Sequence, residues 1–226
     1  YEVNASLVIR VRVKDERNGS VDGMFTVNLA DLNDAPAHLS AVGSLSISEN
    51  QPVGTLVADF NASDQDINAT LTYELVSGSG DSGNGLFILD SNGTLRSASM
   101  FDFENNASIY SVRVRVSDER NASIEANFSV SVLDINEDPF NLVSIAALSV
   151  AENQPAGYLV GEFNASDQDA NTTLTYELAS GTGDAGKILF SLESNGKLRT
   201  AHPLDYEVNA SLVIRVRVKD QWNGSV

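Results

Sequence analysis

The chain has 226 residues, no cysteine, 42% hydrophobic residues and a formal net charge of -17. This hydrophobic share supports a folded core, and the length suits one to two domains. The absence of cysteine excludes disulfide frameworks, thiolate catalysis and cysteine-type zinc sites. The negative charge argues against nucleic acid and anionic membranes as partners.

Alternation of apolar and polar residues predicts β-strands along the whole chain. The clearest alternating segments are residues 9–13, 25–29, 71–75 and 128–132. Turn sequences separate the strands at Asn18-Gly19, Gly78 to Gly85, Asn92-Gly93 and Asn195-Gly196. No segment has the period of an amphipathic helix. About seven short strands in roughly 100 residues predict an all-β chain of tandem Greek-key β-sandwiches of immunoglobulin-like type.

The sequence repeats itself at an offset of 103 residues. SENQPVG around Glu49 returns as AENQPAG around Glu152, and FNASDQD ending at Asp66 returns ending at Asp169. This period is too long for a helical repeat unit and fits a whole small domain. We expect the C-terminal strands of a first repeat at 1–36, a complete repeat at 37–139, and a third repeat at 140–226 that lacks its last strand.

Carboxylates recur at fixed places in each repeat. In the complete repeat they form the motifs Ser48-Glu49-Asn50, Asp64-Gln65-Asp66, Phe101-Asp102-Phe103-Glu104, Val116-Ser117-Asp118 and Asp134-Ile135-Asn136-Glu137-Asp138-Pro139. Calcium takes six to eight oxygen ligands from carboxylates, amides and carbonyls. Several like charges gathered at one hinge would repel each other unless cations neutralise them.

The order and spacing of these motifs resemble the cadherin repeat over essentially the whole chain. The resemblance implies calcium ions at the junctions of adjacent repeats. At the earlier junction the implied ligands are Glu2, Leu32, Asn33, Asp34, Asp64, Asp66 and Asp118. At the later junction they are Glu49, Asp102, Glu104, Ile135, Asn136, Glu137, Asp138, Asp167, Asp169 and Asp220. Leu32 and Ile135 would contribute backbone carbonyls, and Glu152, Asp205 and Glu207 form half of a further site.

Both linkers are one residue shorter than the family's usual D-x-N-D-N-x-P. In addition, Glu137 stands where the family has aspartate. The number of ions at each junction therefore stays open between two and three.

Two other interpretations of the carboxylates are weaker. An EF-hand beginning at Asp64 would need glycine and glutamate where Ala69 and Leu75 stand, and helices rather than strands as its flanks. Paired carboxylates could hydrolyse glycosides, but these recur at the ends of modules rather than in a cleft. The two histidines, His38 and His202, are not repeated. We therefore predict that the chain is not an enzyme.

The predicted function is calcium-dependent adhesion or extension by an extracellular, cell-surface repeat array, the ectodomain of a membrane-associated protein. Expected partners are calcium ions, neighbouring repeats, and like molecules or polysaccharide, but no nucleic acid. The alternative is a calcium-dependent carbohydrate-binding module of a secreted bacterial protein. The acidity and near-identical copies favour a bacterial source with unmodified Asn-X-Ser/Thr sequences.

Overall fold

A computed structural model describes residues 6–208 and 210–226. Sixteen β-strands and two short 3-10 turns form the regular structure of these residues, as the alternating pattern predicts. The chain divides into two compact units, Tyr1–Asp134 and Ile135–Val226. No helix among the described residues is long and apolar enough to cross a membrane.

The first strands form a two-stranded hairpin, β1 (Ser6–Lys14) and β2 (Ser20–Asn28). Asn18 has a φ of 65° in the connecting turn, a conformation that asparagine tolerates well. Asp22 lies opposite Arg12 and accepts hydrogen bonds from both Arg10 and Arg12. The apolar side chains of both strands are exposed, among them Phe25 at 56%.

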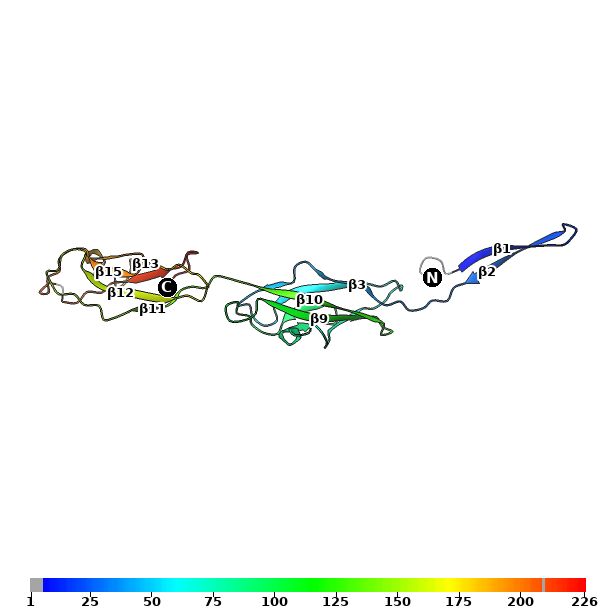
Figure 1. The fold of residues 1–226 in the computed structure, drawn as a ribbon, viewed down its shortest axis with the longest axis horizontal. Coiled ribbons are helices and arrows are strands. Elements are labelled where there is room, and N and C mark those ends of the chain that lie inside the picture. The colour runs from blue at the N-terminus through cyan, green and yellow to red at the C-terminus, as the bar shows by residue number, and fades with distance from the viewer. Residues whose placement is uncertain (1–5, 209) are drawn as a thin grey trace. The chain divides into compact units, whose positions relative to one another are not determined.

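The complete repeat is a sandwich of two four-stranded sheets (Figure 1). One sheet has the order β3 (Ala37–Val42), β5 (Leu56–Ser63), β8 (Thr94–Ser97) and β7 (Phe87–Leu89), with the 3-10 turn η1 (Asn84–Leu86) before β7. The other has the order β4 (Ser46–Ser48), β10 (Ser123–Leu133), β9 (Ile109–Ser117) and β6 (Thr72–Leu75). The predicted sandwich is confirmed.

The core of the complete repeat comes from the inward residues of both sheets. Val112, Val114, Val116, Val130 and Leu95 are fully buried at 0% exposure. The outward face carries ion pairs instead, since Glu125 on β10 accepts hydrogen bonds from Arg113 and Arg115 on β9. The strand β10 therefore contributes to both faces of its sheet.

The first sheet of the third repeat has the same strand order, but the second sheet has fewer strands. Its first sheet contains β11 (Phe140–Ser144), β12 (Leu159–Ser166), β15 (Lys197–Thr200) and β14 (Phe190–Leu192), with the turn η2 (Lys187–Leu189) before β14. Its second sheet contains only β13 (Thr175–Leu178) and β16 (Val216–Lys219). Its largest buried cluster contains Ala165, Tyr176 and Val218.

Candidate metal-binding carboxylate clusters

The start cluster of the complete repeat contains Asn33, Asp34, Asp64, Asp66 and Asp118. Asp64 and Asp66 directly follow β5, Asp118 follows β9, and the other two residues lie in the preceding linker. The structure brings all five together. The Asn33 amide donates a hydrogen bond of 2.7 Å to Asp118 Oδ2, and the Asp34 backbone N–H donates one of 3.0 Å to Asp66 Oδ2.

The start cluster of the complete repeat also contains buried oxygens that receive no hydrogen bond from the described residues. Within residues 6–208 and 210–226, Asn33 Oδ1, Asp64 Oδ2 and Asp66 Oδ1 lack any hydrogen-bond donor. Burying a polar oxygen without a partner is costly, and for carboxylate oxygens the cost is larger. The donor set is all oxygen, which is the chemistry that a hard divalent cation prefers.

Asp118 is held in place by its own turn. Its Oδ1 accepts hydrogen bonds from the backbone N–H groups of Arg120 and Ala122. Burial raises the pKa of Asp118, but these hydrogen bonds and the one from Asn33 outweigh burial, so the pKa lies below its usual range. The carboxylate is therefore charged and fixed at neutral pH.

The start cluster of the third repeat repeats this geometry. It contains Asn136, Glu137, Asp138, Asp167, Asp169 and Asp220. The Asn136 amide donates a hydrogen bond of 2.8 Å to Asp220 Oδ2, and the Glu137 backbone N–H donates one of 3.0 Å to Asp169 Oδ2. Asp138 accepts a hydrogen bond from the backbone N–H of Ser225.

The surroundings of Asp167 disfavour the charged form of its carboxylate. Burial raises the pKa of Asp167, and the neighbouring carboxylates of Asp169 and Asp220 raise it further, against a lowering hydrogen bond from the Asp169 N–H. Its Oδ2 has no donor within the described residues. A cation beside Asp167 would relieve both the burial and the repulsion.

The end cluster of the complete repeat contains Glu49, Asp102 and Glu104. One carboxylate oxygen of each lies within 4.8 Å of the others. Glu49 is only 1% exposed, and its Oε2 accepts a hydrogen bond of 2.6 Å from the Phe103 backbone N–H. Hydrogen bonds from the side chain and backbone of Asn105 lower the pKa of Asp102.

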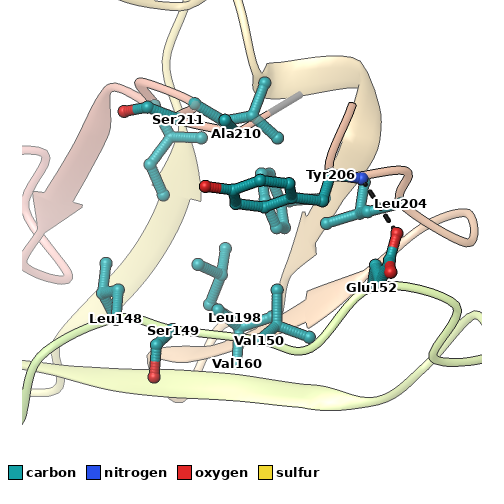
Figure 2. A pocket seen from close by; sticks show the side chains of 13 residues that line it. Leu148, Ser149, Val150, Glu152, Val160, Leu198, Leu204, Tyr206, Ala210 and Ser211 are labelled. Atoms are coloured by element: carbon teal, nitrogen blue, oxygen red, sulfur yellow. Dashed lines mark hydrogen bonds between the residues drawn. The ribbon is translucent and has the colours of Figure 1, made fainter. Parts of the chain in front are cut away.

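The end cluster of the third repeat contains Glu152, Asp205 and Glu207. Their carboxylates also approach within 4.8 Å, but all three residues are exposed. The Tyr206 backbone N–H donates a hydrogen bond to Glu152 Oε2, as the dashed line in Figure 2 marks. This cluster thus has the composition of the end cluster of the complete repeat without its burial.

The remaining expected ligands lie in the linkers or outside the described part. Leu32 and Ile135 have hydrocarbon side chains, so only their backbone carbonyls could serve as ligands. Glu2 lies outside the described residues.

Two further carboxylates were missed by the sequence argument. A carboxylate oxygen of Asp134 lies within 4.8 Å of one of Glu104. Asp15 has the turn geometry of Asp118, because its Oδ1 accepts hydrogen bonds from the Arg17 and Gly19 backbone N–H groups. The 103-residue offset relates Asp15 to Asp118 and Asp134 to Asp31, and could have identified both.

Comparison with known sequences supports a single family. A sequence model described as "Cadherin domain" matches residues 43–133 and 146–225. The human protein Protocadherin Fat 4 is 32% identical over 242 residues, which cover all of this chain and 5% of that protein. Human Protocadherin-16 is 37% identical over 209 residues, or 88% of this chain and 6% of that protein. The chain thus spans only a small part of these relatives.

Solved structures show the same fold. A Protocadherin gammaB7 EC3-6 cis-dimer structure superimposes with a TM-score of 0.68 at 23% identity, covering all of this chain and 59% of that one. Human CDH23 EC21-23 gives a TM-score of 0.64 at 22% identity, covering 97% and 69%. The predicted resemblance and all-β fold are confirmed.

The comparisons also bear on location and source. The expected extracellular, cell-surface location is confirmed, because the sequence relatives are protocadherins. The named relatives are mammalian proteins, and the interpretation of a bacterial source finds no support among them.

Proposed function

The chain belongs to the cadherin family, and from that premise we propose that its carboxylate clusters bind calcium and hold each linker against the repeat that follows it. The observation that carries this proposal is the set of buried oxygens without donors in the start clusters, Asn33 Oδ1, Asp64 Oδ2, Asp66 Oδ1 and Asp167 Oδ2. In each start cluster, the same residues that would bind the ion already attach the linker to the repeat.

The chemistry of the clusters favours calcium over other metals. Zinc and copper sites are built from histidine and cysteine, whereas the ligands here are carboxylates, amides and backbone carbonyls. Magnesium demands a near-ideal octahedron and keeps several waters, while calcium accepts six to eight oxygens in flexible geometry. The start cluster of the complete repeat offers four carboxylates and the Asn33 amide, and this set of oxygens suits calcium.

The proposed ligands of the complete repeat are the residues of its start and end clusters, with the carbonyl of Leu32. Those of the third repeat are the residues of its two clusters, with the carbonyl of Ile135. The predicted number of ions at each junction is two or three. The module boundaries near residues 36 and 139 are part of the same proposal.

Calcium would make the linkers stiff. Residues 31–36 and 134–139 lack strand structure, so their order depends on the contacts of Asn33, Asp34, Asn136 and Glu137. An ion bound to both linker and repeat removes the freedom of the linker and lowers the repulsion among the carboxylates. The proposed role is adhesion through a calcium-stiffened array, with like molecules as the expected partners and no enzymatic activity.

Calcium titration of the 226-residue chain tests this proposal. We expect saturable binding of several ions with dissociation constants of about 10⁻⁴–10⁻³ M, as in other extracellular modules. Asp66→Asn should remove ions from the start cluster of the complete repeat, whereas Asp59→Asn, at an exposed position inside β5, should bind as the wild type does. Absence of saturable binding, or equal binding by both variants, would contradict the proposal.

A further inference from the structure

A side chain outside the start cluster of the complete repeat joins the two loops that carry its aspartates. Asp64 and Asp66 lie in the loop between β5 and β6, and Asp118 lies in the turn between β9 and β10. Glu119 directly follows Asp118, and its Oε2 accepts a hydrogen bond of 2.9 Å from the backbone N–H of Thr70. This loop-to-loop hydrogen bond therefore ties the turn after β9 to the loop after β5.

The third repeat has the same contact with a different side chain. Gln221 directly follows Asp220, and its Oε1 accepts a hydrogen bond of 2.7 Å from the backbone N–H of Thr173. Thr173 corresponds to Thr70 at the 103-residue offset, and Gln221 takes the place of Glu119. Glutamate and glutamine have the same length and both end in an acceptor oxygen, but only glutamate is charged. The feature that both repeats share is thus the acceptor oxygen rather than the charge.

The loop-to-loop hydrogen bond lies beyond the paired strands. β6 and β9 pair from Thr72 and Ser117 onward. Thr70 precedes this pairing, in the loop that carries Asp66. Its hydrogen bond to Glu119 therefore extends the attachment between the two chain segments from the sheet toward the carboxylates.

The same hydrogen bond completes a ring around the start cluster. The Asn33 amide is bonded to Asp118 in one loop. The backbone N–H of Asp34 is bonded to Asp66 in the other loop. Asn33 and Asp34 are neighbours in the linker, so the linker contacts both loops, and the hydrogen bond from Thr70 joins the two loops directly. The separation of the aspartates in the two loops therefore depends on this bond as well as on the linker.

Repulsion between carboxylates acts against this arrangement. Asp64 and Asp66 come from one loop and Asp118 from the other, so their like charges push the two loops apart. A hydrogen bond between the loops opposes this displacement. It raises the fraction of molecules in which the loops are close enough to share a cation, and the apparent affinity for the cation rises with that fraction.

We propose that Glu119 and Gln221 are positioning residues that hold the two loops of each start cluster at the separation that a calcium ion requires. This inference rests on the proposed function, because the ligands that are positioned are those of the carboxylate clusters. Each residue acts through a backbone N–H, that of Thr70 or that of Thr173, and does not itself bind the ion. Glutamate and glutamine can therefore replace each other at both positions, whereas alanine cannot replace either.

Calcium titration of the whole chain, followed by NMR, measures the two start clusters separately. The backbone amide signals of Asp64 and Asp66 report on the complete repeat, and those of Asp167 and Asp169 report on the third repeat. Spectra recorded in chelator show whether each variant has kept its fold before calcium is added.

Two alanine variants remove the loop-to-loop hydrogen bonds one at a time. Glu119→Ala should weaken calcium binding roughly fivefold at the start cluster of the complete repeat and leave the third repeat unchanged, because an exposed hydrogen bond to a charged acceptor is lost. Gln221→Ala should do the reverse, with a loss of about threefold, since a neutral acceptor forms the weaker hydrogen bond. Folded variants that bind calcium like the wild type would overturn the inference and leave the proposed function intact.

Glu119→Gln distinguishes positioning from charge. It keeps the acceptor oxygen, so calcium binding should stay within about twofold of the wild type at physiological salt. A loss as large as that of Glu119→Ala would overturn the positioning role. The matched control is Glu74→Ala, which removes the same charge from β6, where the side chain is 57% exposed and faces Arg115. This control should bind calcium like the wild type.

Hydrogen exchange at the Thr70 amide in chelator gives a measurement that needs no calcium. Exchange should be slower in the wild type and in Glu119→Gln than in Glu119→Ala, because only the first two keep the acceptor. Equal exchange in all three would contradict the hydrogen bond on which the inference depends. A wild-type chain that shows no saturable change at Asp64 and Asp66 would overturn the proposed function and this inference together.

Discussion

Two segments with one sequence adopt different structures in this molecule. Residues 6–14 form the nine-residue strand β1, whereas the identical residues 211–219 form a strand only over Val216–Lys219. β1 has a partner along its full length in β2, while residues 211–215 have no partner on the side away from β13 among the described residues. The difference teaches that the neighbouring strand, rather than local propensity, decides how far this strand extends.

The two repeats also differ in how deeply the carboxylates of their end clusters are buried. Glu49 is 1% exposed beside the end of β10, and its backbone N–H donates a hydrogen bond to the Leu133 carbonyl. Glu152, its counterpart in the third repeat, is exposed. A strand of the second sheet thus shapes the end cluster as well as the core.

The largest effect is expected from breaking β10 in the complete repeat. Val130→Asp places an unpaired charge at a position that is 0% exposed and should cost about 4 kcal/mol or more of the free energy of unfolding. Urea unfolding followed by circular dichroism measures this loss. Ser129→Asp, on the exposed face, should change the stability by about 0.5 kcal/mol or less. Similar losses for both would show that β10 does not close the core.

The converse change should extend the strand structure of residues 211–217. Appending the sequence of residues 22–31 after Val226 supplies a strand continuous with Ser225 and Val226. We expect residues 211–217 to become protected from hydrogen exchange by roughly 100-fold, because their amides gain partners. The same extension with Phe25 and Val27 replaced by aspartate is the control and should protect little. Unchanged exchange in the intact extension would contradict the comparison.

A smaller effect is expected at the two end clusters. Glu49→Gln should weaken calcium binding roughly tenfold, about 1.4 kcal/mol, because the buried carboxylate is already held by the Phe103 N–H. Glu152→Gln should weaken it only a few-fold, since an exposed ligand is less well positioned. Isothermal titration calorimetry with both variants measures the difference. An equal effect would show that burial does not tune these clusters.

The smallest effect concerns pH. Protons compete with calcium for Asp167, whose pKa is raised by burial and by Asp169 and Asp220, so calcium should be lost as pH falls through that raised pKa. Without calcium, the effect of acidification on stability has the opposite sign, because the folded chain binds the proton on Asp167 more tightly than the unfolded chain does. Acidification in this window then stabilises the third repeat. Thermal unfolding in calcium and in chelator checks both signs. Asp167→Asn should remove the part of the pH dependence that comes from this raised pKa.

The sequence could predict the repeats, the strands and the members of most clusters. The 103-residue offset and the alternation in segments such as Phe128–Val132 report local structure, and both are visible without coordinates. Glu49 lies near Asp102 and Glu104 in one cluster, and Asp66 lies near Asp34 and Asp64 in another. These features depend on short patterns that each repeat carries in full.

The burial of individual residues could not be predicted in the same way. Glu49 and Glu152 lie in nearly the same sequence, yet only Glu49 has a complete sheet beside it. The orphaned oxygens of Asn33 and Asp64 depend on which backbone N–H groups reach the other oxygens of the cluster, such as the Asp66 N–H on Asp64 Oδ1. Such contacts depend on the assembled fold rather than on a pattern.

The parallel pairing of β4 with β10 has a mechanical consequence. β4 lies near the beginning of the complete repeat and β10 at its end, and Ser131 and Glu49 donate backbone hydrogen bonds to the carbonyls of Leu45 and Leu133. Tension applied to the two ends of this repeat pulls the two strands in opposite directions along their length. Their hydrogen bonds are then loaded in shear and must break together.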